Sequence, residues 1–280
     1  MVATDQPDVL RAGDTARPFI LKIGGGAAIN HAGIVADLAE LATPCVVVAG
    51  ANALRDDLAE RLGTPTRTLT SVSGYTSVFS DVEAIDVILM SYAGVRNRRL
   101  VELCQQHGVN AVGLTGLDGR LVEGQRNRGI RIRERGKMLI TRDFSGKPRR
   151  VNTALLRLLL DHGYTPVLSI PILDEQGYAI NSENDDIVTV LQESLRAPRI
   201  IHLIEASGFL ADPDDPDSRV PHLTRDALAR REQEVEGRMR RKLLALTRLL
   251  DTGATEVIIS DGRVEHPIRD ALAGKGTRIG

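Results

Sequence analysis

The first stretch of the sequence with chemical potential is a lysine followed closely by three glycines. Lys22 stands in the short apolar run Phe19–Ile23, and Gly24, Gly25 and Gly26 follow before helix-prone sequence begins. Glycines between a strand and a helix let backbone N–H groups approach an anion, and the helix N-terminus adds favourable partial charge. The spacing fits neither a Walker A loop nor a dinucleotide fingerprint. The stretch therefore predicts either a phosphate cradle beside Lys22 or an ordinary tight turn.

Polar residues elsewhere in the chain would complete a phosphate site. A second strand ends in Gly50 and Ala51, Asp185 opens a later helix, and Lys242 stands in a basic run. Phosphoryl transfer asks mainly for positioning and for cancellation of oxygen charge. Two lysines from opposite sides, backbone N–H donors and an organising carboxylate, Asp185, suffice for that task. The non-catalytic alternatives are that Asp185 only compensates the helix dipole at the helix start and that Lys242 is only a solvated surface residue.

Short apolar runs alternate with helical patterns along most of the chain. This alternation is typical of an α/β fold with a parallel sheet, because parallel strands are buried on both faces. Pro198 marks a plausible boundary between two lobes, 18–197 and 198–280, after a flexible leader, 1–17. The runs expected as strands are 19–23, 45–48, 109–114, 165–170, 200–204 and 256–260.

Local signals refine this pattern at three places. Residues 64–80 are rich in Thr, Ser and Gly, so we expect a loop there. Asp81 is a candidate N-cap for the helix that follows. Asn181 and Asp185 lie four residues apart, so their side chains share one helix face if the first turn covers both.

The segment 120–150 interrupts the α/β pattern. Glycines separate short alternating runs, which indicates inserted β-hairpins. The segment carries eleven basic side chains against three acidic ones, a net charge of +8. Such local asymmetry in a near-neutral chain favours a partner-facing surface, and a solvated hairpin is the alternative. The candidate docking residues are Arg126, Arg128, Arg131, Arg133 and Arg135.

The composition sets wider limits. The 280 residues carry a formal net charge of −1, which predicts no general affinity for nucleic acid or membranes. Tryptophan is absent and aromatic residues make up 3%, so we expect an aliphatic core. No stretch is long enough to span a bilayer, and Cys45 and Cys104 fit small core residues in a reducing compartment. A cytoplasmic protein is expected.

Together these motifs resemble the amino acid kinase superfamily over essentially the whole chain from residue 19. Lys22-x-Gly24-Gly25 resembles its first glycine corner, and Ala179–Asp185 and Gly237–Lys242 resemble two further motifs shared with N-acetylglutamate kinases. The stretches 73–77, 110–121 and 261–268 are more similar to the branch that phosphorylates 2-aminoadipate, or glutamate, attached to a small acidic amino-group carrier protein.

The resemblance implies a three-layer αβα sandwich with an acceptor-binding N-terminal lobe and a nucleotide-binding C-terminal lobe. It implies ATP as phosphoryl donor, Mg²⁺ carried by ATP without protein side-chain ligands, the carrier protein as partner, and a homodimer. Lys22 and Lys242 would stabilise the transferring group, held by Asp185. The implied backbone donors are Gly24, Gly25, Gly50 and Ala51. The implied acceptor residues are Asn181, Tyr75 and Ser77. The implied nucleotide residues are Glu205, Ser207, Gly208, Phe209 and Met239.

Three positions depart from the family pattern. Ala51 replaces a glycine of the second corner, and its methyl group threatens either crowding or a forbidden backbone conformation. Val78 stands where an arginine usually grips the substrate carboxylate, so either the acceptor lacks that carboxylate or Arg67 or Arg96 serves instead. Glu205 stands near the nucleotide, after Ile204, where Ser/Thr-Asp/Asn is usual.

Three functions fit the sequence. The first is a carrier-dependent kinase that forms an acyl phosphate on an aminoadipate-like or modified amino acid, in lysine-type, arginine-type or specialised biosynthesis. The second is an N-acetylglutamate kinase acting on the free acetylated amino acid, which leaves the basic hairpin without a purpose. The third is a catalytically weak regulatory or binding homologue, which the two substitutions Ala51 and Val78 favour.

Overall fold

A computed structural model describes residues 17–41, 43–72, 74–134, 137–212, 214–234, 237–253 and 256–280. The leader expected at 1–17 therefore lies, except for Arg17, outside the described residues. Within helices and strands, the side chains of Glu134 and of residues 237–242 also lie outside them.

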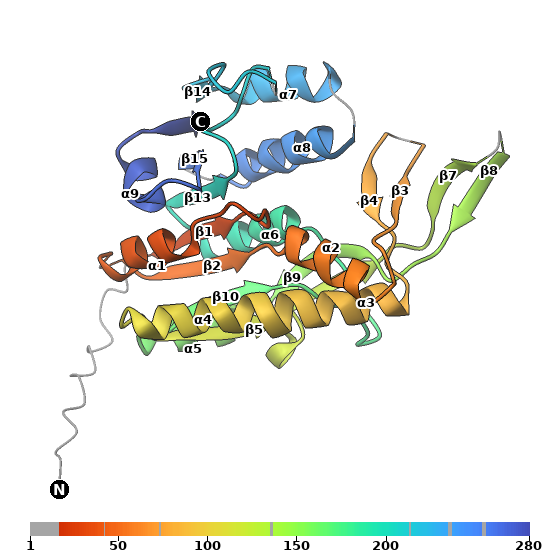
Figure 1. Ribbon diagram of the computed structural model, residues 1–280, viewed down its shortest axis with the longest axis horizontal. Coiled ribbons are helices and arrows are strands. Elements are labelled where there is room, and N and C mark those ends of the chain that lie inside the picture. Colours follow the sequence, from red (N-terminus) through yellow and green to blue (C-terminus); the bar gives the residue numbers. More distant parts are fainter. Residues whose placement is uncertain are drawn as a thin grey trace, which may run out of the picture.

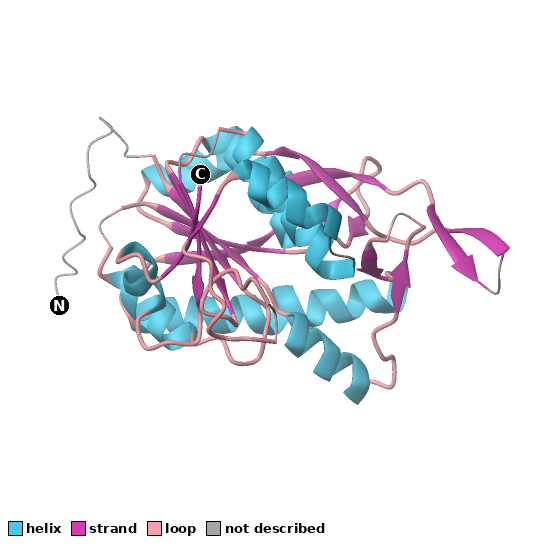
Figure 2. Ribbon diagram, turned by 90° about the horizontal axis from the view of Figure 1, so that it is seen from above, coloured by secondary structure: helices cyan, strands magenta, loops and turns pink. Residues whose placement is uncertain are grey.

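A single eight-stranded sheet runs through the middle of the molecule (Figure 2). Its order is β14-β16-β15-β13-β1-β2-β10-β5, and all neighbours are parallel except β15 and β16. Each strand expected from an apolar run is present, which confirms the predicted α/β class with a mostly parallel sheet. The strands are β1 (Phe19–Ile23), β2 (Cys45–Ala49), β5 (Ala111–Thr115), β10 (Thr165–Ser169), β13 (Arg199–Ile204), β14 (His222–Leu223), β15 (Glu256–Asp261) and β16 (Gly276–Ile279).

Helices cover both faces of this sheet (Figures 1 and 2). A π-helical segment, η1, joins α3 to α4, so the helix expected after Asp81 continues as one long rod in Figure 1. The helices are α1 (His31–Ala39), α2 (Asn52–Arg61), α3 (Val82–Ile88), η1 (Leu89–Arg96), α4 (Asn97–Gln106), η2 (Asp118–Arg120), α5 (Thr153–Asp161), α6 (Asn184–Leu195), α7 (Arg225–Glu234), α8 (Gly237–Asp251) and α9 (Pro267–Leu272). The Asp81 side chain accepts a hydrogen bond from Ala84 N, which confirms the predicted cap of α3.

Alternate residues of β1 face two separate cores. Phe19, Leu21 and Ile23 pack with α1, α4 and α9 on one face, where both free cysteines are also buried. Ile20 packs on the other face with α3, α5, α6 and α8. Because side chains alternate along a strand, Lys22 projects to this second face. Lys22 is thus placed by the same pleat that buries its apolar neighbours.

Smaller sheets flank the body. A loop was expected over residues 64–80, and this expectation is wrong for part of the segment. There β3 (Thr68–Thr70) and β4 (Thr76–Val78) pair as a hairpin. The predicted hairpins near 120–150 are present. A four-stranded sheet contains β12 (Ala179–Ile180), β11 (Ile172–Leu173), β6 (Val122–Arg126) and β9 (Gly146–Val151), and β7 (Ile130–Glu134) pairs with β8 (Lys137–Thr141). Figure 1 shows the β3–β4 and β7–β8 hairpins projecting at the same end of the molecule.

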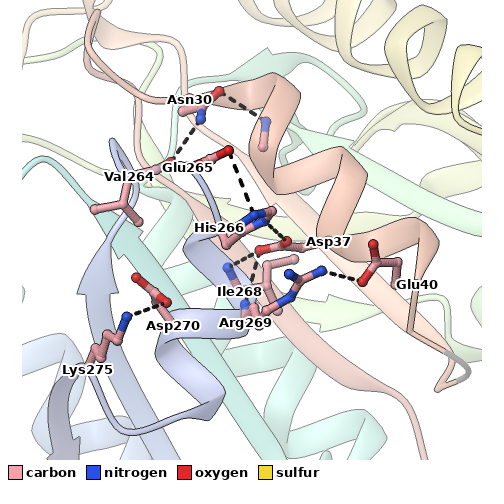
Figure 3. Close-up of polar contacts among 11 residues, drawn as sticks. Asn30, Asp37, Glu40, Val264, Glu265, His266, Ile268, Arg269, Asp270 and Lys275 are labelled. Atoms are coloured by element: carbon pink, nitrogen blue, oxygen red, sulfur yellow. Dashed lines mark hydrogen bonds and ion pairs between the residues drawn. The ribbon is translucent and has the colours of Figure 1, made fainter.

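A buried carboxylate joins α1 and α9, the first and last helices of the described residues. Asp37 of α1 accepts hydrogen bonds from Ile268 N (2.9 Å) and Arg269 N (3.0 Å) at the start of α9. His266 Nδ1 lies 3.0 Å from its other oxygen (Figure 3). Free N–H groups at a helix start require such acceptors, so Asp37 fixes α9 against α1.

The sheet divides evenly at the β13–β1 boundary. Four strands come from residues after Pro198 and four from before it, so the two predicted lobes share one continuous sheet. Among the described helices, none has the length and apolar character needed to cross a membrane.

Candidate active site

A cavity of about 630 Å³ opens at the carboxyl ends of β1, β2 and β13. In open α/β sheets this edge is where ligands bind, because loops from adjacent strands diverge there. The cavity walls bring together the first glycine corner, the second corner, the start of α6, the β4 strand and part of α8.

Lys22 and Asp185 form an ion pair inside this cavity. Their Nζ and Oδ1 atoms lie 3.1 Å apart, and their side chains are 11% and 22% exposed. Asp185 occupies the first turn of α6, where the helix dipole favours a negative charge. The pair therefore fixes an ammonium group at the end of β1, next to the glycines.

His202 is a neighbour that the sequence reading missed. It faces Lys22 in the β1–β13 register, and its Nδ1 lies 3.7 Å from the same Asp185 oxygen. The residue is 5% exposed and lines the cavity. A lone titratable side chain within the apolar run Ile200–Ile204 was the signal available in the sequence.

The two glycine corners touch through their backbones. A Cβ on Gly50 would lie 2.7 Å from Gly25 N, and a Cβ on Gly25 would lie 2.5 Å from Asn52 N. Gly24, Gly25 and Gly50 all line the cavity. The close approach explains why side chains are missing at these positions, and it leaves the strand ends open to an anion.

Ala51 does not obstruct the cavity. Its φ is −148°, outside the positive range that favours glycine, so the backbone does not require a glycine here. The residue is fully buried and packs in the apolar core on the Lys22 face of the sheet. Ala51 is absent from the cavity walls in the described part of the chain, so its methyl group does not crowd the site.

The expected acceptor residues divide into two groups. Asn181, Ser77 and Val78 line the cavity, and Asn181 Nδ2 donates a 2.9 Å hydrogen bond to Ser80 Oγ. Asn181 precedes α6, so the first turn does not cover both residues and the condition for a helix face shared with Asp185 is not met. Tyr75 points elsewhere, with its hydroxyl 3.2 Å from Glu232 Oε1.

Neither arginine proposed as a substitute for the missing clamp lines the main cavity within the described chain. Arg67 pairs with Asp81 and lies over the Phe79 ring, 4.6 Å from its centroid. Arg96 lies 3.4 Å from His31 Nδ1, and burial lowers the pKa of its guanidinium. A third arginine, Arg55, lines the cavity and is 7% exposed.

On the expected nucleotide side, Glu205, Gly208 and Phe209 line the cavity. Glu205 Oε1 accepts a 2.6 Å hydrogen bond from Ala28 N, so its carboxylate lies over the first glycine corner. A Cβ on Gly26 would fall 1.9 Å from that carboxylate. Ser207 is not among the described wall residues.

Three predicted residues fall outside the described part of the chain. They are Arg135 and the side chains of Met239 and Lys242. The next turns of α8 are described, and Leu243 and Leu246 line the cavity. The helix that carries Lys242 therefore borders the same space as Lys22, while the convergence of the two lysines stays a prediction.

The basic residues of the insertion differ in their surroundings. Arg131 and Arg133 are exposed on β7, and Arg128 is exposed before it. Arg126 instead stacks on Phe144, 3.8 Å from the ring centroid, and its Nε donates to Asp143 O at 2.8 Å. Beside Arg131 and Arg133 in the β7–β8 register stand Ile140 and Met138, which are 69% and 53% exposed.

These features form a cavity on an α/β sheet whose charges and glycine corners suit phosphoryl transfer. The model of the amino acid kinase family matches residues 17–261, so the chain belongs to that family. The predicted family is therefore confirmed.

Several known proteins are similar to this chain in sequence or in fold. The [LysW]-aminoadipate kinases of Thermus thermophilus and Deinococcus radiodurans are 38% and 37% identical; each match covers 93% of this chain, and 99% and 91% of those proteins. An acetylglutamate kinase of Methanopyrus kandleri is 29% identical over 93% of this chain and 99% of its own. The N-acetylglutamate synthase of Neisseria gonorrhoeae, 20% identical, superposes with a TM-score of 0.76 over 94% of this chain and 59% of that one, which supports the fold alone.

Proposed function

We propose that this protein is an ATP-dependent kinase acting on the side-chain carboxylate of an amino acid attached to an acidic amino-group carrier protein. The product is an acyl phosphate. The observation that carries this proposal is the Lys22–Asp185 ion pair beside two glycine corners, in a family member whose relatives include [LysW]-aminoadipate kinases.

The reaction requires little covalent chemistry from the protein. The bond between the γ-phosphorus and the β–γ bridging oxygen breaks as a carboxylate oxygen of the acceptor bonds to phosphorus. The acceptor is already ionised, so no proton has to be removed. Lys22, held by Asp185 at 3.1 Å, would neutralise charge on the transferring oxygens, and the glycine-corner N–H groups would position them. Lys242 would act from α8.

The donor we propose is ATP with Mg²⁺ bound to its phosphates. In the described residues, no cluster of three or more His, Cys, Asp or Glu side chains has the arrangement of a metal site. Mg²⁺ is commonly held by substrate phosphates and few protein ligands. Glu205, Gly208 and Phe209 would face the nucleotide.

The β7–β8 hairpin is the proposed contact for the carrier. Arg131 and Arg133 offer exposed positive charge, with Met138 and Ile140 on the same face of the hairpin. An acidic carrier with an apolar spot would match such a surface in charge and in burial of apolar area. A homodimer remains an expectation from the family resemblance, and a cytoplasmic location remains an expectation from the composition.

A hydroxylamine trap for acyl phosphate tests the proposed function. ATP and Mg²⁺ are supplied with carrier-linked 2-aminoadipate, carrier-linked glutamate, free N-acetylglutamate and free N-acetyl-2-aminoadipate. Hydroxamate from carrier-linked acids alone supports the proposal. Turnover of free N-acetylglutamate would instead identify an acetylglutamate kinase. This is the second candidate, and the similarity to the Methanopyrus acetylglutamate kinase favours it. ATP binding without hydroxamate from any acid would identify a regulatory homologue.

A further inference from the structure

We propose that Arg55 binds the second carboxylate of the acceptor, the one that is not phosphorylated. This inference rests on the proposed function and deepens it. Arg55 belongs to α2, an element for which the sequence predicted no acceptor contact. The substrate class that follows is an N-acylated amino dicarboxylic acid.

The position of Arg55 is the first support. It lines the main cavity together with Thr76, Ser77 and Val78 of the β4 strand. A second cavity of about 180 Å³ lies between α2, the 63–67 turn and α3, and Arg55 and Val78 line that one too. Arg55 and Val78 therefore both lie at the boundary between the two cavities. At this boundary α2 provides a cation, and β4 provides only the isopropyl group of Val78.

Burial and charge are the second support. The Arg55 side chain is 8% exposed, and a guanidinium cannot shed its proton to escape a low-dielectric site. Its Nε and Nη2 donate to one oxygen of Asp56, at 3.0 and 2.8 Å. In the described chain, no hydrogen bond uses Nη1. A buried guanidinium with donors to spare is suited to a further carboxylate.

The other cations around the cavity leave this role to Arg55. Among its described wall residues, Arg55 is the one arginine and Lys22 the one lysine. Lys22 is held by Asp185 at the glycine corners, where the phosphoryl group would lie. An acceptor with two carboxylates needs a cation for each end, and a charge without a partner in a closed site is strongly disfavoured. One carboxylate would lie at Lys22 and the other at Arg55.

The experiment compares two probes on matched variants by calorimetric binding. The probes are carrier-linked 2-aminoadipate and the same conjugate with its α-carboxylate converted to a primary amide. The variants are Arg55→Leu, Arg55→Lys, the double variant Arg55→Leu/Val78→Arg, and the control Arg61→Leu. Arg61 lies on the same helix, is 73% exposed and pairs with Asp57. Thermal melting checks the fold of each variant.

The wild type should prefer the acid to the amide by on the order of 30- to 100-fold, the range of a buried charge-assisted hydrogen bond. Arg55→Leu should lose this preference while ATP binding stays unchanged, and Arg61→Leu should keep it. The double variant should regain part of it, because the charge returns from β4. A merely structural role for Arg55 would lower the melting temperature and leave the preference intact.

The inference is overturned if Arg55→Leu retains the acid preference, or if the wild type binds acid and amide equally. Because binding is measured without turnover, the proposed function is tested separately. A wild type that binds the acid selectively but forms no acyl phosphate would end the proposed function and leave the Arg55 assignment standing. A wild type that binds neither probe would end the Arg55 assignment.

Discussion

Nζ of Lys22 and Oδ1 of Asp185 lie 3.1 Å apart at the mouth of the two glycine corners. Lys22 lies near the end of β1 and Asp185, 163 positions later, in the first turn of α6, so only the folded sheet brings them together. This arrangement holds a positive charge where developing phosphate charge would need it, without further reorganisation.

Removing either partner should reduce turnover. We expect Lys22→Met to lower kcat by on the order of 10²-fold or more, because a charge that acts mainly in the transition state is lost. Asp185→Asn should have a similar effect. The fold-reduction of kcat in the double variant should be much smaller than the product of the two single reductions, because the two residues act as a pair. Steady-state kinetics measure kcat for each variant. Lys275→Met is the control, because Lys275 is an exposed lysine that pairs with Asp270 and does not line the cavity. An unchanged kcat in Lys22→Met would exclude its proposed role.

The contact between the glycine corners predicts a steric effect. In Gly50→Ala the new Cβ would lie 2.7 Å from Gly25 N, so one corner must shift. We expect both a lower kcat/KM and a loss of stability of about 1–3 kcal/mol. Gly94→Ala is the matched control, because its nearest contact is 3.5 Å away. Equal behaviour of the two variants in activity assays and urea unfolding would contradict the close packing of the corners.

The β7–β8 hairpin predicts selective loss of carrier recognition. Arg131→Glu/Arg133→Glu should raise KM for a carrier-linked acid at least about tenfold and leave KM for ATP unchanged, with a smaller effect at high salt. Ile140→Ser should raise the same KM through lost apolar contact. The charge-reversal control is Arg99→Glu, on α4 and 73% exposed. If the hairpin variant and this control give the same KM, the carrier does not bind through this surface.

The Asp37 cluster predicts a large stability effect far from the cavity. Asp37→Ala should lower the free energy of unfolding by about 3 kcal/mol, because the buried Ile268 N–H and the Arg269 N–H lose their acceptor. Glu40→Ala removes only an exposed pair with Arg269 (Figure 3) and should stay within about 1 kcal/mol. Denaturant unfolding distinguishes the two. Comparable losses would show that Asp37 is not the tie between α1 and α9.

His31 predicts a pH effect on stability. Burial, with a further contribution from the Arg96 charge, lowers its pKa from 6.5 to about 4. The unfolded chain therefore binds more protons than the folded one between these values, and the stabilisation present above pH 6.5 is lost as pH falls toward 4. The loss amounts to at most about 3 kcal/mol.

His31→Gln should flatten this part of the profile in urea unfolding measured above pH 6.5 and near pH 4. The control is His162→Gln, an exposed histidine that ends α5. A pH dependence that is identical in the wild type and in His31→Gln would assign the effect to other groups.

Local patterns predicted most elements and their order. Apolar runs found the strands because burial on both faces demands aliphatic residues, and Asp81 was recognised as a cap because capping is local chemistry. The β3–β4 hairpin was missed, since its Thr- and Ser-rich strands are only partly buried and strand pairing depends on neighbours distant in sequence. Whether Asn181 and Asp185 share a helix face could not be decided from sequence, because it depends on the exact start of α6, which lies at Asn184.

The sequence by itself determined the family, the two glycine corners and the identity of Lys22 and Asp185, because motif spacing and strand patterning are properties of the chain. Tertiary structure alone decided that Ala51 is buried in the core, that neither Arg67 nor Arg96 lines the main cavity, and that Arg55 and His202 do. These outcomes depend on which face of a helix or strand meets which neighbour. That choice is made by packing the whole sheet, and no short stretch of sequence contains it.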